Sequence, residues 1–274
     1  PTPPGKCGVA VAKARYAPLW CATNYSFLEG ASFPEEMAER AAELGLASLG
    51  VSDRDGVYGV VRAHAAAKEL GIHLVIGSLI TMEDGSSLLL YAQTRSGYAN
   101  LCTLISRGRL SSPKGFSSLR RRDLEELSRD LIAVLPTQGE IFFGREHLGW
   151  LASLFDDRLY LGVSRHYEEA ELLRERDLHA VAVEHELPLV ALPRTLYHKP
   201  QRRRLQDVVT SIRHGVTLEA AGTLLNPNDR FALPSSQEME ERYADAPQLL
   251  SRSLEIAERC SFSLSEIVYR YPSE

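Results

Sequence analysis

The chain has 274 residues, of which 44% are hydrophobic and 24% charged, and its formal net charge is −5. This composition can bury a sizeable core, which argues against intrinsic disorder, and the acidic balance excludes a protein that coats nucleic acid through its overall charge. The four cysteines form no CxxC pair, and no apolar run reaches the roughly 18 residues of a membrane span. We therefore expect a soluble, cytoplasmic protein without membrane partners, and its size suggests an enzyme.

Short apolar runs alternate with amphipathic stretches along most of the chain. After a tail over residues 1–14, the segment Ser32-Phe33-Pro34-Glu35 has the form of a capping box and predicts a helix that ends at Gly45. Buried strands are predicted over residues 47–51, 72–76, 87–92, 131–135, 158–163 and 187–192. Helices are predicted between most of these strands, over residues 57–70, 97–106, 144–154 and 167–186.

Two stretches depart from this alternation. Residues 107–129 are polar and basic around Arg120–Arg122, which predicts a long loop followed by a short helix. Beyond Pro200 the pattern is helical, over residues 201–214, 217–224, 235–243 and 246–260. The basic run Lys199–Arg204 opens this region, and it is either a solvated helix start or a contact for phosphates or an acidic neighbour. Neither basic run is interleaved with the stacking aromatics that single-strand binders use.

The alternation of strands and helices predicts an α/β fold with a parallel sheet or barrel. In both architectures, functional side chains lie at the carboxyl ends of the strands. These ends are predicted at residues 19–26, 52–56, 78–82, 136–139, 164–167 and 193–198.

Several segments resemble the polymerase-and-histidinol-phosphatase (PHP) domain at the N-terminus of bacterial C-family DNA polymerases. They are Leu19–Ala31 (LWCATNYSFLEGA), Gly50–Gly59, Ala66–Gly77, Gly97–Cys102 and Leu187–Ala191. Further segments are most similar to the error-prone, DnaE-type branch of that family, namely residues 196–198, 205–213 and 257–264. The resemblance runs in order from about Tyr16 to Glu274.

This resemblance implies a distorted seven-stranded β/α barrel with a C-terminal helical extension. The barrel would occupy residues 15–265, with its helical region at about 200–260. Residues 266–274 would begin a linker to a polymerase palm region outside this sequence.

Active members of the family hydrolyse phosphoesters with a cluster of zinc or manganese ions, which needs neutral imidazoles and carboxylates. The resemblance places the family's ligand positions, in chain order, on Trp20, Ala22, Asp53, Arg54, Leu79, Arg194 and Leu196. Two or three divalent ions bring about four to six positive charges, whereas these positions offer one carboxylate and two guanidiniums. We therefore predict no catalytic residue, metal or cofactor for this domain, and expect Mg²⁺ only in the parent polymerase.

The remaining polar positions allow two further expectations. Arg54 and Arg194 can each hydrogen-bond Asp53 in the space that a metal cluster would fill, or both can point outward to solvent. His166 and His198 follow strand ends, and with Asp53 they are the candidates for a minimal mononuclear metal site.

Three functions follow from the resemblance and the residues. The first is a catalytically degenerate scaffold of an error-prone DNA polymerase used in damage-induced synthesis. It would contact the palm and thumb domains of the same polypeptide, and reach DNA only through the parent protein, whose other regions carry out polymerisation. The second is a metal-dependent phosphoesterase or 3′–5′ exonuclease with a rearranged metal site. The third is an interaction module that recruits other mutagenic-repair proteins through residues 200–260.

Overall fold

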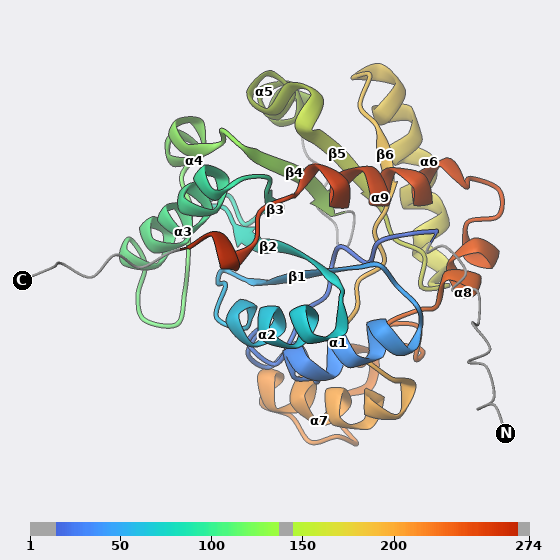
Figure 1. Cartoon of the computed structure of the whole chain (residues 1–274). Helices are drawn as coiled ribbons and strands as arrows, with labels where there is room; N and C mark the ends of the chain where they lie inside the picture. Colours follow the sequence, from blue (N-terminus) through green and yellow to red (C-terminus); the bar gives the residue numbers. More distant parts are fainter. Residues whose placement is uncertain (1–14, 137–144, 268–274) are drawn as a thin grey trace, which may run out of the picture.

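A computed structural model describes residues 15–136 and 145–267. A six-stranded sheet, in the spatial order β1-β2-β3-β4-β5-β6, curls through the middle of the molecule, with helices packed around it (Figure 1). The strands are β1 (Ser48–Arg54), β2 (His73–Thr81), β3 (Ser87–Ala92), β4 (Leu131–Pro136), β5 (Leu159–Val163) and β6 (Leu189–Ala191). All six were predicted from the sequence, most of them to within a few residues. The predicted tail, 1–14, and most of the predicted linker, 266–274, lie outside the described residues.

The third strand runs against its neighbours. β3 pairs antiparallel with both β2 and β4, whereas the other neighbouring strands pair in parallel. The expectation of a parallel sheet was therefore wrong at β3, while the α/β class is confirmed. Only five residues separate β2 from β3, and Gly85 adopts a left-handed φ of 84° in this turn. A connection this short can form a hairpin but cannot hold the crossover that parallel strands require.

The N-terminal segment Pro18–Ala22 joins the two edges of the sheet. Cys21 forms parallel bridges with Val51 in β1 and with Thr195, beyond β6. On one side the Gly50 amide donates to the carbonyl of Pro18 at 2.7 Å, and on the other the Ala22 amide donates to the carbonyl of Thr195 at 2.9 Å. The described residues form six full strands of a distorted α/β barrel, so the expectation of seven was wrong, and Pro18–Ala22 is a short bridging segment instead of a full strand.

The helices are α1 (Pro34–Glu43), α2 (Val60–Leu70), α3 (Arg95–Leu110), α4 (Arg121–Leu127), α5 (Arg145–Phe155), α6 (Glu169–Glu184), α7 (Arg203–His214), α8 (Ser236–Arg242) and α9 (Gln248–Arg259). The prediction of a helix over 217–224 was wrong, because only the 3₁₀ turn Gly222–Leu224 forms there. Gly222 has a φ of 48°, which is incompatible with a continuous α-helix. Within the described residues, no helix is long and apolar enough to cross a membrane.

The cap of α1 differs by one residue from the predicted capping box. Phe33 precedes the helix, and its amide donates to the carboxylate of Glu36 at 2.9 Å. The Ser32 hydroxyl instead lies 2.7 Å from Nδ1 of His198 and accepts a hydrogen bond from the His198 amide at 3.0 Å. The Ser32 hydroxyl, which the local sequence predicted to cap the helix, therefore bonds His198 instead.

Alternate strand residues serve two separate cores. The outer core joins the sheet to surrounding helices and contains Ile76 and Ile80 of β2. The inner core fills the barrel, where Leu79 of β2 and Tyr91 of β3 meet Ile256 of α9. The red helix α9 crosses the sheet in Figure 1, and it contributes further inner-core residues. The period of two along each strand thus gives a barrel buried on both faces.

Gly77 leaves the space that the Tyr91 ring occupies inside the barrel. A β-carbon on Gly77 would lie 2.5 Å from Cδ1 of Tyr91, and Tyr91 is fully buried. Gly77→Ala should therefore destabilise the fold by about 1–3 kcal/mol through overpacking. Urea unfolding followed by circular dichroism measures this free energy of unfolding.

The control is Gly149→Ala, in helix α5, where an added β-carbon has no heavy atom within 4 Å. This substitution should raise the free energy of unfolding by roughly 0.5–1 kcal/mol, because alanine loses less backbone entropy in a helix. A destabilisation of equal size in both variants would contradict the role given to Gly77.

Candidate functional site

Asp53, at the end of β1, ties the loop over residues 23–31 to the barrel. Its buried carboxylate accepts hydrogen bonds from the Thr23 amide at 2.7 Å, the Thr23 hydroxyl at 2.8 Å and the Ser26 hydroxyl at 2.7 Å. Burial raises the pKa of Asp53, although the hydrogen bonds from Ser26 and Thr23 oppose that rise. The Asp53 carboxylate is therefore held by neutral hydrogen-bond donors and not by charged side chains, and its role here is structural.

Glu29, at the end of the same loop, collects the arginines that we had expected around Asp53. Nε of Arg54 lies 2.5 Å from Glu29 Oε1, and Nη2 of Arg194 lies 2.6 Å from Glu29 Oε2. Nη1 of Arg213, in the last turn of α7, lies 3.3 Å from Oε1. The prediction that Arg54 and Arg194 bond Asp53 was wrong, and so was the alternative that both point outward. The loop brings a second carboxylate to the two guanidiniums, while Thr23 and Ser26 occupy Asp53.

Positive charge exceeds negative charge in this cluster. Glu29 is only 5% exposed, and burial by itself would raise its pKa, but Arg194 and Arg54 outweigh burial and hold the pKa below its ordinary value. Burial lowers the pKa of Arg194, and Glu29 opposes that effect. The guanidinium of Arg194 also lies over the Trp20 ring, 5.4 Å from its centroid. Three guanidiniums share one carboxylate, which leaves the cluster cationic.

The four apolar ligand positions belong to hydrophobic cores. Trp20 and Leu79 lie in the inner core of the barrel. Ala22 and Leu196 lie in a third apolar cluster, together with Phe231. These side chains pack where the family resemblance places ligands, and none of them offers a lone pair for a metal.

The two histidines proposed for a mononuclear metal site, His166 and His198, form hydrogen bonds with other residues. His166 is fully buried, with Nδ1 3.0 Å from Glu171 Oε1 and Nε2 3.1 Å from the Arg194 carbonyl, and its ring stacks on Phe231. His198 faces Ser32, and burial lowers its pKa although Glu36 opposes this. Across residues 15–136 and 145–267, no group of three or more His, Cys, Asp and Glu side chains is arranged to hold a metal. The structure therefore does not bring the Asp53, His166 and His198 set together.

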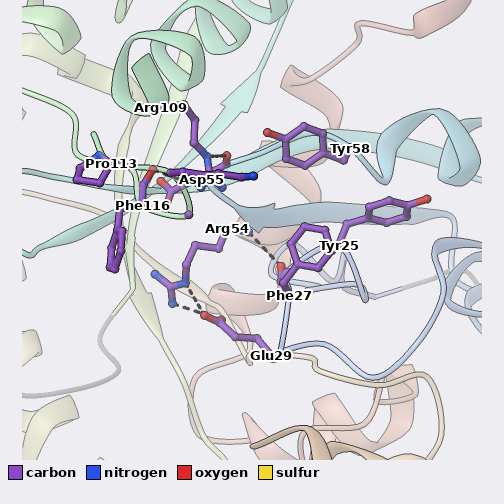
Figure 2. A pocket seen from close by; sticks show the side chains of 12 residues that line it. Tyr25, Phe27, Glu29, Arg54, Asp55, Tyr58, Arg109, Pro113 and Phe116 are labelled. Atoms are coloured by element: carbon purple, nitrogen blue, oxygen red, sulfur yellow. Dashed lines mark hydrogen bonds and ion pairs between the residues drawn. The ribbon is translucent and has the colours of Figure 1, made fainter. Parts of the chain in front are cut away.

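A pocket of about 740 Å³ opens beside the Glu29 cluster (Figure 2). Three separate segments line it, through residues 25–27 and 29, residues 54, 55 and 58, and residues 109 and 113–116. Tyr25, Phe27, Tyr58 and Phe116 contribute aromatic rings, while Arg54, Arg109 and Lys114 contribute cations. Sequence reasoning missed this site, since its residues lie on three separate segments. The signal available was that Lys114 and Phe116 stand together in the polar stretch over 107–129.

The fold and the site together are those of an α/β barrel with charged loops at one rim. An α/β barrel closed by its N-terminal segment carries its clustered charges on loops at the carboxyl ends of β1 and β6. The family model described as "PHP domain" matches residues 19–176, which is more than half of the chain. The chain therefore belongs to the PHP domain family, and the resemblance seen in the sequence is confirmed.

Curated relatives extend the match over nearly the whole chain. The error-prone DNA polymerase of Methylococcus capsulatus is 42% identical over 265 residues, which cover 96% of this chain and 25% of that protein. Error-prone DNA polymerase 1 of Agrobacterium fabrum is 40% identical over 261 residues, which cover 95% of this chain and 24% of that protein. The chain thus spans about a quarter of the length of these relatives.

Solved structures give weaker matches. An amidohydrolase from Chromobacterium violaceum has a TM-score of 0.48 at 16% identity, covering 66% of this chain and 87% of the other. A two-domain protein from Bacteroides vulgatus, containing a predicted PHP-like metal-dependent phosphoesterase, has a TM-score of 0.43 at 13% identity, covering 65% and 51%.

Removing the Glu29 charge should destabilise the protein. Glu29→Gln leaves three guanidiniums without their shared carboxylate, and we expect a loss of about 1–3 kcal/mol at pH 7. This is below the full cost of breaking a buried pair because Arg54 and Arg213 are partly exposed. Chemical denaturation measures the change. The matched control, Glu43→Gln, removes an exposed partner of Arg40 and Lys199 and should change stability far less.

The pH dependence of stability, compared between wild type and Glu29→Gln, is a second test of the Glu29 charge. The pKa of Glu29 is held below its ordinary value of 4.5 in the fold, so its charge contributes stability above that value. This contribution falls as the pH drops through the lowered folded-state pKa. The stability difference between wild type and Glu29→Gln should therefore be full at neutral pH and shrink as the pH falls below 4.5. A difference that grows on acidification would contradict the assignment.

Proposed function

We propose that this chain is the catalytically degenerate PHP domain of an error-prone DNA polymerase, in which it serves as a scaffold during damage-induced DNA synthesis. The sequence identity to error-prone DNA polymerases over nearly the whole chain supports the proposal that the parent protein is such a polymerase. In this proposal, regions outside the chain carry out DNA-directed polymerisation with Mg²⁺. The domain contacts the palm and thumb of the same polypeptide and reaches DNA through the parent protein. A cytoplasmic location, expected from the scattered cysteines, is part of the proposal.

The cationic Glu29 cluster is the observation that carries the scaffold role. A zinc or manganese cluster needs carboxylates and neutral imidazoles, but the corresponding positions hold apolar core side chains and the guanidiniums of Arg54 and Arg194. Asp53 is the carboxylate among them, and Thr23 and Ser26 already satisfy it. The residues present do not fit a metal cluster, so we derive no hydrolytic step from this site.

One surface feature favours the interaction module as a second candidate function. On α7, Leu205, Val208 and Ile212 are 43%, 42% and 61% exposed, and their spacing places them along one helix face. Figure 1 shows α7 at the lower edge of the molecule, separated from the sheet by other helices. An exposed apolar stripe of this kind suits a partner domain or a repair protein.

Asp53 should matter for stability and not for catalysis. Asp53→Asn turns an amide NH₂ toward groups that donate to the carboxylate, which we expect to lower the free energy of unfolding by about 1–3 kcal/mol. In the full-length polymerase, this variant should keep the wild-type rate of primer extension at temperatures where it stays folded. Asp157→Asn, at a side chain that is 75% exposed and pairs with Arg259, is the control that should keep the rate of primer extension and change stability far less.

The rearranged-site phosphoesterase remains the competing enzyme hypothesis, and a direct assay separates it from the scaffold. The purified domain is incubated with Mn²⁺ and either a generic phosphomonoester or a primer strand, and its metal content is measured by mass spectrometry. The scaffold predicts no turnover beyond that of Asp53→Ala and no stoichiometric metal. Hydrolysis that Asp53→Ala abolishes would refute it.

A further inference from the structure

The aromatic side chains of the pocket beside the Glu29 cluster are unusually exposed. Phe27, Phe116 and Tyr58 are 74%, 69% and 54% exposed. Figure 2 shows these rings and that of Tyr25 on different sides of Arg54 and Arg109. Burying a ring against a partner is favourable, so several exposed rings around one hollow indicate a surface that a ligand covers.

The same pocket is cationic, because its lining holds more cations than carboxylates. Glu29 is shared by three arginines, of which Arg54 lines the pocket. The carboxylate of Asp55 accepts hydrogen bonds at 2.8 Å from the amide and the hydroxyl of Thr81. Lys114 is exposed and forms no ion pair with another residue in the part of the chain that the structure describes. The lining thus carries the three cations Arg54, Arg109 and Lys114 against the two carboxylates Glu29 and Asp55, and Arg194 and Arg213 add two further positive charges at Glu29.

Hydrogen bonds to backbone carbonyls fix the segment over residues 109–116, which forms one side of the pocket. The turn Pro113–Phe116 is closed by a hydrogen bond from the Phe116 amide to the Pro113 carbonyl at 3.0 Å, and Gly115 supplies its φ of 94°. Nε of Arg109 donates to the Asp55 carbonyl at 3.1 Å, which connects α3 to the end of β1. This turn therefore presents Lys114 and Phe116 to the pocket without needing a ligand to order them.

We propose that this pocket binds a short stretch of single-stranded nucleic acid, without a metal and without cleaving it. Phosphates contact Arg54, Arg109 and Lys114, and unpaired bases stack on the exposed rings. A cationic groove with aromatic platforms is the arrangement that sequence-independent single-strand binding uses, because every base has a stacking face. A volume of about 740 Å³ lies within the range of roughly 300–1,000 Å³ that accommodates a small ligand such as one nucleotide unit.

This inference goes beyond the scaffold role, since it assigns the domain a ligand of its own. A duplex keeps its bases stacked inside the helix and cannot present them to the rings. An acidic peptide could meet the charges, but it would leave the rings without stacking partners. The combination of cations and open ring faces therefore favours an unpaired strand over both.

Fluorescence anisotropy with a labelled oligothymidylate of roughly 16 nucleotides, in EDTA, tests the proposal on the whole chain. Phe116→Ala should weaken binding by about fivefold or more, the effect of losing one stacked base. Lys114→Glu should weaken binding and lower the slope of log K against log salt by about 1. Both side chains are exposed, so the variants should fold, which circular dichroism checks.

Matched controls lie outside the pocket. Leu110→Ala truncates an apolar side chain that is 87% exposed, and Lys68→Glu makes the same charge reversal near the end of α2. Both should bind the oligonucleotide as the wild type does. Oligouridylate and oligodeoxyuridylate of equal length differ only in the 2′-hydroxyl and show whether the sugar matters, and binding of either strand supports the proposal.

Several results would overturn the inference. They are absence of binding in EDTA at low salt, equal affinity for a duplex, and equal competition by polyglutamate. Equal losses in the pocket variants and their controls would overturn it as well. The scaffold proposal has separate readouts, namely Mn²⁺-dependent hydrolysis and primer extension, so failure of one idea is distinguishable from failure of the other.

Discussion

Closure of the sheet by the segment Pro18–Ala22 is the constraint on which the rest of the structure depends. Cys21 bridges β1 to the chain beyond β6, and these contacts bring two distant parts of the sequence to the same rim. The chain leaves this segment through Thr23 and Ser26, which Asp53 holds. Glu29 thereby comes within reach of Arg54 from β1 and Arg194 from the other edge. Without closure, the two arginines would not share a carboxylate.

The charge balance at this rim follows from burial. A buried carboxylate is stable in its ionised form only with cationic or hydrogen-bonding partners. Glu29 has cationic partners, and Asp53 has hydrogen-bond donors. Asp53 has neutral donors and a raised pKa, whereas Glu29 has three guanidiniums and a lowered one. The excess of guanidiniums makes the rim attract anions, which is the opposite of what a metal cluster needs. The scaffold proposal and the proposed strand-binding pocket both depend on the positive net charge of this rim.

Local sequence patterns predicted elements well and predicted partners poorly. β3 was predicted at residues 87–92, where it forms, because its apolar run stands between clear turn signals. Its direction was wrong, since periodicity does not tell a hairpin from a crossover. The cap of α1 shifted because Ser32 contacts His198, which is 166 positions away. The candidate site followed the same rule. Asp53, Arg54 and Arg194 were singled out from the sequence, but Glu29 carries no signal there that separates it from any other loop glutamate.

The sequence by itself determined the family, the order of the strands along the chain, and the absence of ligand-type side chains at Trp20, Ala22, Leu79 and Leu196. Each of these is a property of residue identity and spacing. Only the tertiary structure decided which carboxylate the arginines neutralise and how three loops form one pocket of rings and cations. Electrostatic and stacking interactions act over a few ångströms in space. Residues as far apart as Phe27 and Phe116 can therefore line one pocket only after the barrel has closed.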